Sequence, residues 1–322
     1  MSILVYTESE NGKFKKNAFE VASYASEVAK QLGTSVTAIS VNADENENLG
    51  EYGVSKVLNV SDERLKTFNA KAYAHAIVAA SKKEGAQVIV VGSSTDTKFL
   101  APIVAANLGA GYAPNVVAAP ESTSPFTVKR TAFSNKGYAH TQINSDIKLI
   151  GVSNNSFGSA ENKVSVSVEA FEPSLTDSDF ATKSIEVDKV AGKATIADAD
   201  IVVSGGRGLK GPENWGMLEE LADVLGAATA CSKPVSDMGW RPHGEHVGQT
   251  GKPVASNLYI AIGISGAIQH LAGVSASKTK VVINTDPEAP FFKAADYGIV
   301  GDAFEIVPKL TEKLKEFKAQ NA

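Results

Sequence analysis

Cysteine is almost missing from this sequence. Cys231 is the single cysteine among 322 residues, so the chain cannot form a disulfide within itself. The same scarcity excludes a cysteine-rich metal or iron–sulfur site. The sequence therefore does not require an oxidising compartment, and we expect Cys231 to be a small apolar side chain in or near a strand.

Long apolar runs and an excess of positive charge are missing as well. No stretch approaches the ~20 apolar residues that a transmembrane helix needs, and the first residues lack the basic and apolar segments of a signal peptide. The formal net charge is −5, whereas nucleic acid or an anionic membrane usually requires a basic face on its partner. We therefore expect a cytoplasmic protein that neither binds nucleic acid nor inserts into a membrane. A mature chain of the mitochondrial matrix would show the same features.

The first part of the chain alternates short apolar strands with helices. Strands are expected at 3–7, 36–41, 56–60 and 87–91, and helices at 18–32 and 68–84. The earlier helix has apolar residues at a spacing of three and four and is followed by Gly33, a common helix terminator. Strands that alternate with helices predict βαβ units and a parallel sheet.

Residues 115–172 follow a different pattern. Short β-branched segments lie close together, and no helix-length segment separates the later ones. This spacing predicts antiparallel strands near 115–172, at one side of the first domain. The polar segment 172–193, which contains Pro173 and several aspartates, is predicted to be a linker. We therefore place an N-terminal domain at 1–190 and a C-terminal domain at 191–322.

The second domain repeats the α/β pattern. Strands are expected near 200–204, 258–264 and 281–284, and helices at 213–225, from about 266, and at 303–319. The predicted fold class is α/β, with two domains that each contain a mainly parallel sheet flanked by helices.

Glycine-rich turns follow two strands of the second domain. Ser204-Gly205-Gly206-Arg207-Gly208 and Gly263-Ile264-Ser265-Gly266-Ala267 each stand between an apolar strand and a helix. In an open α/β sheet such turns lie at the carboxyl ends of parallel strands, where backbone N–H groups can approach an anion. Ser265 can either cap the following helix or donate to a phosphate. The first turn is equally consistent with a tight connection that carries a solvent-facing arginine, and it does not match the GxGxxG fingerprint.

Three further features could carry a site. The loop 247–251, Val-Gly-Gln-Thr-Gly, lies in a long segment with little regular structure, which is uncommon unless it is functional. Asn284 follows a strand and opens a proline-containing turn, so it suits either turn formation or ligand binding. His243 and His246 have an i, i+3 spacing, but neighbouring proline and glycine disfavour a helix and no third ligand is evident. We therefore expect no metal site.

Taken together, these segments resemble the alpha subunit of electron-transfer flavoproteins. The run 258–273, LYIAIGISGAIQHLAG, closely matches that family's signature, which continues at 281–284 and 286–290. The segments 204–208 and 247–251 match in sequence and in order. The specific match covers about residues 200–308, whereas the first domain resembles the family in its pattern and placement.

The resemblance implies that the C-terminal domain is a doubly wound fold that binds FAD in an extended form. The implied cofactor-binding residues are Arg207, Ser232, Val247, Gly248, Gln249, Thr250, Ser265, Gly266, Ala267, Ile268, Gln269, His270, Asn284, Asp302 and Ala303. In the family, the flavin carries out the redox chemistry and the protein tunes its potential.

The resemblance also implies roles along the cofactor. Arg207 would lie by the isoalloxazine, where a cation favours the reduced or anionic semiquinone form. Thr250 would bond near N5, Gln249 would lie along the ring and ribityl chain, and His270 would approach the O2 side. Ser232 and residues 265–267 would meet the phosphates. Asn284 and Asp302 would bind the adenosine end. In isolation, His270 reads as a satisfied helix histidine rather than as a ligand-binding residue, and it is the neighbouring segments that suggest a functional role.

The partners follow from the same resemblance. It implies a heterodimer with a beta subunit of related fold, acting as an electron carrier without substrate turnover of its own. Acyl-CoA or related dehydrogenases would donate electrons, as in fatty acid β-oxidation, and a quinone oxidoreductase would accept them. A bifurcating variant stays open, because its second flavin would lie in the beta subunit.

Two readings compete with this one. The first domain also suits the adenine-nucleotide hydrolase-like superfold, and a non-redox adenine-nucleotide-binding module is the alternative function. In the family named above, the alpha first domain lacks a nucleotide, and we expect none here. A scaffold protein that uses the turns only for packing is the third reading.

Overall fold

The computed structural model describes residues 2–133, 135–187, 195–196 and 199–321. Contacts within the chain divide it into two compact units. The first comprises Met1–Ala132 and Tyr138–Asp188, and the second comprises Phe133–Gly137 and Lys189–Ala322. The domain boundary predicted between residues 190 and 191, and the end of the predicted linker at 188–193, lie outside the described residues.

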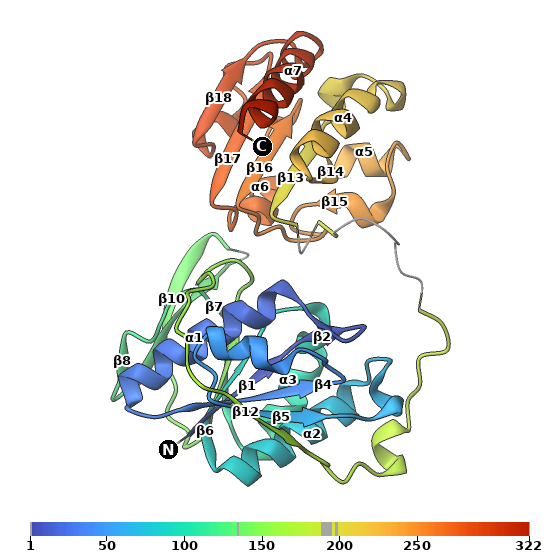
Figure 1. Ribbon diagram of the computed structural model, residues 1–322. Coiled ribbons are helices and arrows are strands. Elements are labelled where there is room, and N and C mark those ends of the chain that lie inside the picture. The colour runs from blue at the N-terminus through green and yellow to red at the C-terminus, as the bar shows by residue number, and fades with distance from the viewer. Residues whose placement is uncertain (1, 134, 188–194, 197–198, 322) are drawn as a thin grey trace. The chain divides into compact units, whose positions relative to one another are not determined.

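The first unit is built on one large, mostly parallel sheet (Figure 1). Within the described residues, its strands follow the order β10-β9-β7-β11-β6-β1-β4-β5-β12, and β8 pairs with β9. The strands are β1 Ser2–Thr7, β4 Val36–Val41, β5 Lys56–Val60, β6 Ala86–Val91, β7 Gly111–Val116, β8 Ser122–Thr123, β9 Phe126–Ala132, β10 Gly137–Gln142, β11 Lys148–Val152 and β12 Ser167–Ala170. A separate antiparallel ribbon is formed by β2 Ser9–Glu10 and β3 Lys13–Phe14.

Helices cover both faces of this sheet, which explains why its central strands are apolar throughout. The helices are α1 Lys16–Leu32, α2 Ala70–Glu84 and α3 Thr95–Leu108. Ile3 and Val5 of β1 belong to the core under α1, whereas Leu4 and Tyr6 belong to the core under α2 and α3. Successive residues of a strand point to opposite faces, so a strand covered on both sides needs apolar residues at every position. The predicted parallel βαβ arrangement of this region is confirmed.

The prediction of antiparallel pairing near 115–172 is only partly right. β9 pairs antiparallel with β7 and with β8. However, β11 lies inside the sheet and runs parallel to both β6 and β7, and β12 runs parallel to β5. A short β-branched segment looks the same in either direction, because its polarity is set by the partners that the tertiary fold supplies.

An extended crossover takes the place of a helix between β11 and β12, and it runs along α1. The carboxylate of Glu20 accepts hydrogen bonds from the backbone N–H groups of Asn155 at 2.7 Å and Phe157 at 2.8 Å. The hydroxyl of Ser23 accepts a hydrogen bond from the Ala160 N–H at 3.0 Å. Polar side chains of α1 thus satisfy backbone groups that a crossover helix would satisfy internally. This is why the parallel connection carried no helix signal in the sequence.

The first part of the predicted linker is attached to the first unit. Its 3₁₀ helix, Asp177–Phe180, is held against α2 by Asp179, whose carboxylate lies 2.9 Å from Nδ1 of His75. The Asn69 side chain, which also caps α2, donates to the Thr182 carbonyl at 2.7 Å. The polar composition of this segment therefore reflects hydrogen bonds to α2 rather than a free connection, and the linker prediction is wrong for this part.

The second unit has a wholly parallel sheet within the described residues, in the order β15-β14-β13-β16-β17-β18 (Figure 1). Its strands are β13 Ile201–Gly205, β14 Ala228–Ser232, β15 His246–Val247, β16 Leu258–Ile262, β17 Thr279–Asn284 and β18 Tyr297–Val300. The chain moves outward from β13 to β15 and then crosses back to β16, on the other side of β13. This reversal is the doubly wound topology, so the predicted fold class is confirmed.

Helices also cover both faces of the second sheet. They are α4 Gly216–Leu225, α5 Lys233–Asp237, α6 Ile268–Val274 and α7 Ala303–Asn321. Apolar residues of α4, α5 and α7 share one core, and those of α6 share the other with Phe291. Cys231 is a buried apolar residue of β14, as expected. Among the described residues, no helix combines the length and the apolar character needed to cross a bilayer.

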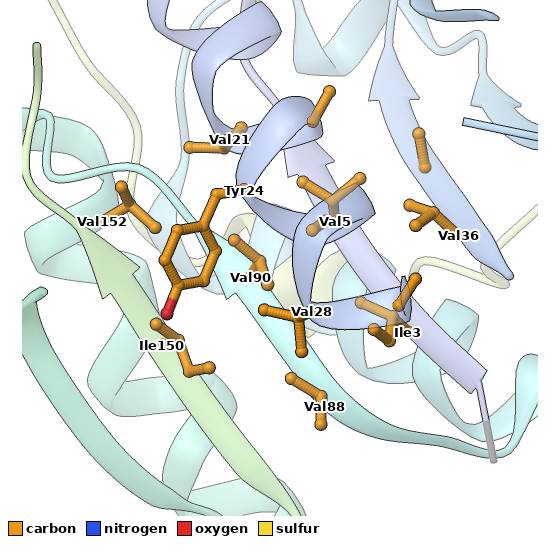
Figure 2. Close-up of a cluster of buried hydrophobic side chains, with 14 of the residues drawn as sticks. Ile3, Val5, Val21, Tyr24, Val28, Val36, Val88, Val90, Ile150 and Val152 are labelled. Carbon is orange, nitrogen blue, oxygen red and sulfur yellow. The ribbon is translucent and has the colours of Figure 1, made fainter. Parts of the chain in front are cut away.

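Tyr24 of α1 carries a buried hydroxyl for which the described residues offer no hydrogen-bond partner. Figure 2 shows its ring among Val21, Val90, Ile150 and Val152. Burial of an unpaired hydroxyl is unfavourable, and it also raises the pKa of this phenol.

Tyr24→Phe is therefore expected to leave the free energy of unfolding unchanged or to raise it by up to about 1 kcal/mol. Tyr73→Phe is the matched control. Its hydroxyl donates to the Leu65 carbonyl at 2.7 Å, so its removal should cost about 1 kcal/mol. Urea unfolding of the three proteins measures both effects. An equal loss at the two positions would show that the Tyr24 hydroxyl does have a partner.

Candidate functional site

Every predicted site residue lies at one edge of the second sheet, where its six parallel strands end. Arg207 follows β13, Ser232 ends β14, Val247–Thr250 end and follow β15, Ser265–His270 follow β16, Asn284 ends β17, and Asp302 and Ala303 follow β18. The strand order reverses between β13 and β16, and ligands of open α/β sheets bind at this switch point. The tertiary structure thus brings together residues that span almost a hundred positions of sequence.

The loops after β13 and β16 touch each other backbone to backbone. The N–H of Gly206 donates to the Ile262 carbonyl at 2.8 Å, and the N–H of Gly208 donates to the Gly263 carbonyl at 3.1 Å. A Cβ on Gly206 would lie 2.1 Å from the carbonyl oxygen of Gly263. The glycines of this turn are therefore needed for close packing, and two of its N–H groups are not available to an anion.

The loop after β16 has free donors instead. The backbone N–H groups of Gly266, Ala267, Ile268 and Gln269 donate no hydrogen bond within the described part of the chain. Gly266 has a φ of 84°, and a Cβ there would lie 2.5 Å from the Phe291 nitrogen. Consecutive N–H groups that point outward at the start of a helix are suited to bind an anion.

Ser265 does not cap this helix. Helix α6 begins at Ile268 with Ala267 as its N-cap residue, and no side chain caps it. The capping interpretation of Ser265 is therefore wrong, and the reason is that Gly266 and Ala267 extend the turn before the helix starts. The side chain of Ser265 is exposed at the sheet edge, and its carbonyl accepts a hydrogen bond from the Phe291 N–H at 3.0 Å.

The loop after β15 packs closely against α6. The N–H of Gln249 donates to the Gln269 carbonyl at 2.7 Å. A Cβ on Gly273 would lie 2.6 Å from the Cα of Gly248, and Gly248 itself has a φ of 151°, which favours glycine. The side chains of Gln249 and Thr250 are exposed, while Val247 and Gly248 are buried. The loop thus holds two polar side chains beside the free N–H groups after β16.

Ser232 is a buried polar residue whose hydroxyl neither caps a helix nor bonds to another described residue. It precedes α5, but its hydroxyl makes no capping hydrogen bond. Its side-chain oxygen has no hydrogen-bond partner among the described residues, although the residue is only 6% exposed. Buried hydroxyls are nearly always paired, so an unpaired one at a sheet edge indicates a ligand.

His270 forms a buried pair with Tyr259. Its Nε2 lies 2.9 Å from the Tyr259 hydroxyl, and Phe291 packs against both rings. Burial lowers the pKa of His270 to about 4, and nearby His246 lowers it further while the Val247 backbone opposes the shift. The imidazole is therefore neutral at pH 7. Its other nitrogen, Nδ1, makes no hydrogen bond of ordinary geometry within the described residues.

Arg207 supplies a positive charge at this edge. Its side chain is exposed and forms no ion pair or hydrogen bond with the described residues. The nearby Lys210 differs, since its Nζ lies 3.9 Å from a carboxylate oxygen of Asp302.

Asn284, Asp302 and Ala303 already have structural tasks. The Asn284 carboxamide donates to the Ile264 carbonyl at 3.1 Å and accepts from the Asp286 N–H at 3.0 Å. Asp302 accepts a hydrogen bond from the Phe304 N–H at the start of α7. Ala303 is buried in the core of the unit. The turn interpretation of Asn284 is therefore confirmed, and any ligand contact would come in addition.

Sequence reasoning missed Tyr259 and Phe291. Both carry no obvious ligand-binding signal, because each reads as an ordinary apolar position of a strand or a turn. The spacing of eleven residues between Tyr259 and His270 does not predict contact, since it crosses a strand, a turn and the start of a helix.

The rings of His243 and His246 lie 5.3 Å apart. In the described part of the chain, no three His, Cys, Asp or Glu side chains are grouped to hold a metal.

Two family models match the chain. The electron transfer flavoprotein domain matches residues 3–176, and the electron transfer flavoprotein FAD-binding domain matches residues 195–275.

Curated relatives match nearly the full length. Electron transfer flavoprotein subunit alpha of Bacillus subtilis is 36% identical over 323 residues, which cover 98% of this chain and 97% of the relative. The subunit of the same name from Megasphaera elsdenii is 36% identical over 327 residues, covering 98% and 97%. A probable electron transfer flavoprotein subunit alpha, mitochondrial, of Caenorhabditis elegans is 36% identical over 313 residues, covering 97% and 93%.

Gly206→Ala is expected to lower the free energy of unfolding by about 3 kcal/mol, because the added methyl group meets the backbone of the β16 loop. Gly216→Ala is the control. This glycine opens α4 and has open space around its Cβ position, so the change should be neutral or stabilise by up to about 1 kcal/mol. Thermal and urea unfolding compare the two, and equal stabilities would contradict the close contact of the two loops.

Proposed function

The chain belongs to the electron transfer flavoprotein family as an alpha subunit, whose second domain binds FAD, and from this premise we propose that it carries electrons from acyl-CoA or related dehydrogenases to a quinone oxidoreductase. In this role it is an electron carrier without substrate turnover of its own. The observation that carries the proposal is the set of free polar groups gathered at one sheet edge. They are the Ser232 hydroxyl, Nδ1 of His270 and four consecutive N–H groups from Gly266 to Gln269, none of which makes a hydrogen bond of ordinary geometry to the described residues.

These groups fit the chemistry of FAD. Its pyrophosphate needs donors rather than acceptors, and the N–H groups of 266–269 together with the Ser232 and Ser265 hydroxyls would supply them. Ser232 is buried and unpaired, so a phosphate oxygen would remove the cost of leaving that hydroxyl without a partner. The partly buried Asn284 and Asp302, with the buried Ala303 beside them, would flank the adenosine end.

The isoalloxazine would be held by the loops after β13 and β15 and by His270. When bound, FAD supplies the redox chemistry, taking up and releasing electrons one or two at a time. Arg207 would place an unpaired positive charge by the ring, and this charge would favour the reduced form. Thr250 and Gln249 would donate or accept hydrogen bonds along the ring and the ribityl chain. His270, being neutral, would contribute a hydrogen bond and no charge.

A partner chain is part of the proposal. In this family role the protein would pair with an electron transfer flavoprotein beta subunit. Exposed apolar side chains on the edge strand β18, including Tyr297 at 67% and Val300 at 58% exposure, support a protein partner for the second unit. The relatives are bacterial and mitochondrial, and the bacterial cytoplasm or the mitochondrial matrix would suit this role. A bifurcating variant would place its second flavin in the beta subunit.

The first unit provides an argument against the alternative of a nucleotide-binding module. At the switch point of its sheet, between β1 and β6, stands the buried carboxylate of Glu8. It accepts hydrogen bonds from the Thr97 hydroxyl at 2.8 Å and from the Asn17 carboxamide at 3.1 Å. A Cβ on the adjacent Gly92 would lie 2.9 Å from that carboxamide, and the other carboxylate oxygen lies 3.6 Å from Nζ of Lys15. A carboxylate at this place disfavours a phosphate, and we propose that this unit holds no nucleotide.

The absorption spectrum of the chain, co-expressed with its genomic neighbour, tests the proposed function. The expected result is a yellow complex with flavin bands in the blue and near-ultraviolet, about one FAD per chain, and bleaching on stepwise reduction. A colourless, folded complex that takes up no added FAD but binds ATP would overturn it in favour of the nucleotide-binding alternative.

Arg207→Ala is expected to lower the reduction potential of the bound flavin by tens of millivolts, because a positive charge that stabilises the reduced form is removed. Redox titration of the purified complex measures the shift. Arg207→Lys retains the charge and should lose less. Lys278→Ala removes an exposed charge at the amino end of β17, on the opposite edge of the sheet, and should change little. Equal potentials in all four proteins would reject the role of Arg207.

A further inference from the structure

Tyr259 is the second residue of β16, and its buried hydroxyl contacts His270 of the predicted flavin site. Its ring is fully buried and stacks on Phe291, with centroids 6.3 Å apart and planes within 1° of parallel. The hydroxyl reaches Nε2 of His270 at 2.9 Å. His270 is itself only 7% exposed. The packing thus fixes both rings and allows neither to turn away from the other.

Both members of this pair are uncharged at neutral pH. Burial raises the pKa of Tyr259 well above its usual range and lowers that of His270 to about 4. A neutral imidazole carries one proton, on either Nδ1 or Nε2. Which nitrogen carries it decides whether the ring offers Nδ1 to a ligand as a donor or as an acceptor.

Given the FAD site proposed above, the geometry points to Tyr259 as a positioning residue: its hydroxyl donates to Nε2 of His270 and so keeps the imidazole proton on Nδ1. Nδ1 makes no hydrogen bond of ordinary geometry to the described residues, and His270 directly follows residues 266–269, whose N–H groups donate no hydrogen bond within that part of the chain.

This arrangement gives the site an uncharged hydrogen-bond donor of fixed direction. A protonated histidine would also donate, but burial makes the cation costly here. A neutral histidine without Tyr259 would distribute its proton between the two nitrogens, and one of the two forms would present a lone pair to an electron-rich flavin atom. Such a lone pair would repel the ligand, and more strongly once negative charge develops on reduction.

Ser204 is the competing acceptor. Its hydroxyl is buried and makes no hydrogen bond of ordinary geometry to the described residues. It opposes the rise in the pKa of Tyr259, as a donor to the phenolate would. If the Tyr259 hydroxyl donated to Ser204 instead, Nε2 of His270 would have to carry the proton and donate to Tyr259. The two arrangements place the imidazole proton on different nitrogens, so the tautomer of the wild-type protein distinguishes them directly.

The first experiment is ¹⁵N NMR of the full-length protein labelled at its histidines, in complex with the partner with which it co-purifies, without and with FAD. His270→Gln assigns the signal. The expected result is the Nδ1–H tautomer in the wild type, both without and with FAD. An Nε2–H tautomer in the wild type overturns the inference without the need for any Tyr259 variant.

The second experiment uses Tyr259→Phe, which removes the hydroxyl and keeps the ring. The His270 signal should change to a mixture of tautomers, and FAD affinity should fall about tenfold, the effect of one buried hydrogen bond. Tyr24→Phe, which removes a buried hydroxyl in the first unit, should change neither. In the His270→Gln background, Tyr259→Phe should no longer alter FAD affinity, because its effect acts through His270.

The outcomes separate the two claims. If the wild type binds no FAD, the proposed function fails, while the tautomer measurement still decides the role of Tyr259. If FAD binds and Tyr259→Phe changes stability but neither the tautomer nor the affinity, Tyr259 is a packing residue and the inference is wrong. An undiminished effect of Tyr259→Phe in the His270→Gln background also overturns it.

Discussion

The loops that follow β13 and β16 touch each other backbone to backbone at the carboxyl edge of the second sheet. Gly206 and Gly208 use their N–H groups to hold this contact, and no larger residue than glycine fits at either place. Arg207 stands between them, so the position of its backbone is set by the contact rather than by the turn alone. Because Gly206 and Gly208 use their N–H groups in this contact, the backbone donors left for a ligand are those of 266–269, further along the loop after β16. The arrangement of the whole candidate site follows from it.

The groups at this edge suit the binding of a cofactor. Among the described residues they are hydrogen-bond donors, one exposed cation and a neutral imidazole. A carrier of electrons needs its cofactor bound, oriented and tuned in potential, and donors with fixed directions serve all three purposes. Burial contributes as much as the residue types do, because it keeps His270 uncharged and leaves the Ser232 hydroxyl in need of a partner.

The two units use similar sheet edges in opposite ways. In the second unit the switch point is surrounded by free donors, which favour an anionic ligand. In the first, the corresponding place is occupied by the Glu8 carboxylate, whose hydrogen bonds come from Thr97 and Asn17. Glu20 likewise accepts hydrogen bonds from backbone N–H groups of the crossover between β11 and β12. Both carboxylates thus accept hydrogen bonds from groups of their own unit.

The sequence by itself determined the α/β class, the repeated strand–helix order and the position of the candidate residues after strands, because burial on both faces and the spacing of helix contacts leave periodic apolar patterns. Four sequence motifs, in the same order as in the family, also identified the family. The direction of β11 and β12, the docking of residues 177–182 on α2 and the pairing of Tyr259 with His270 were decided only by the tertiary structure. Each depends on a contact between segments distant in sequence, and a local pattern contains no information about which distant group will satisfy a given strand, backbone carbonyl or ring nitrogen.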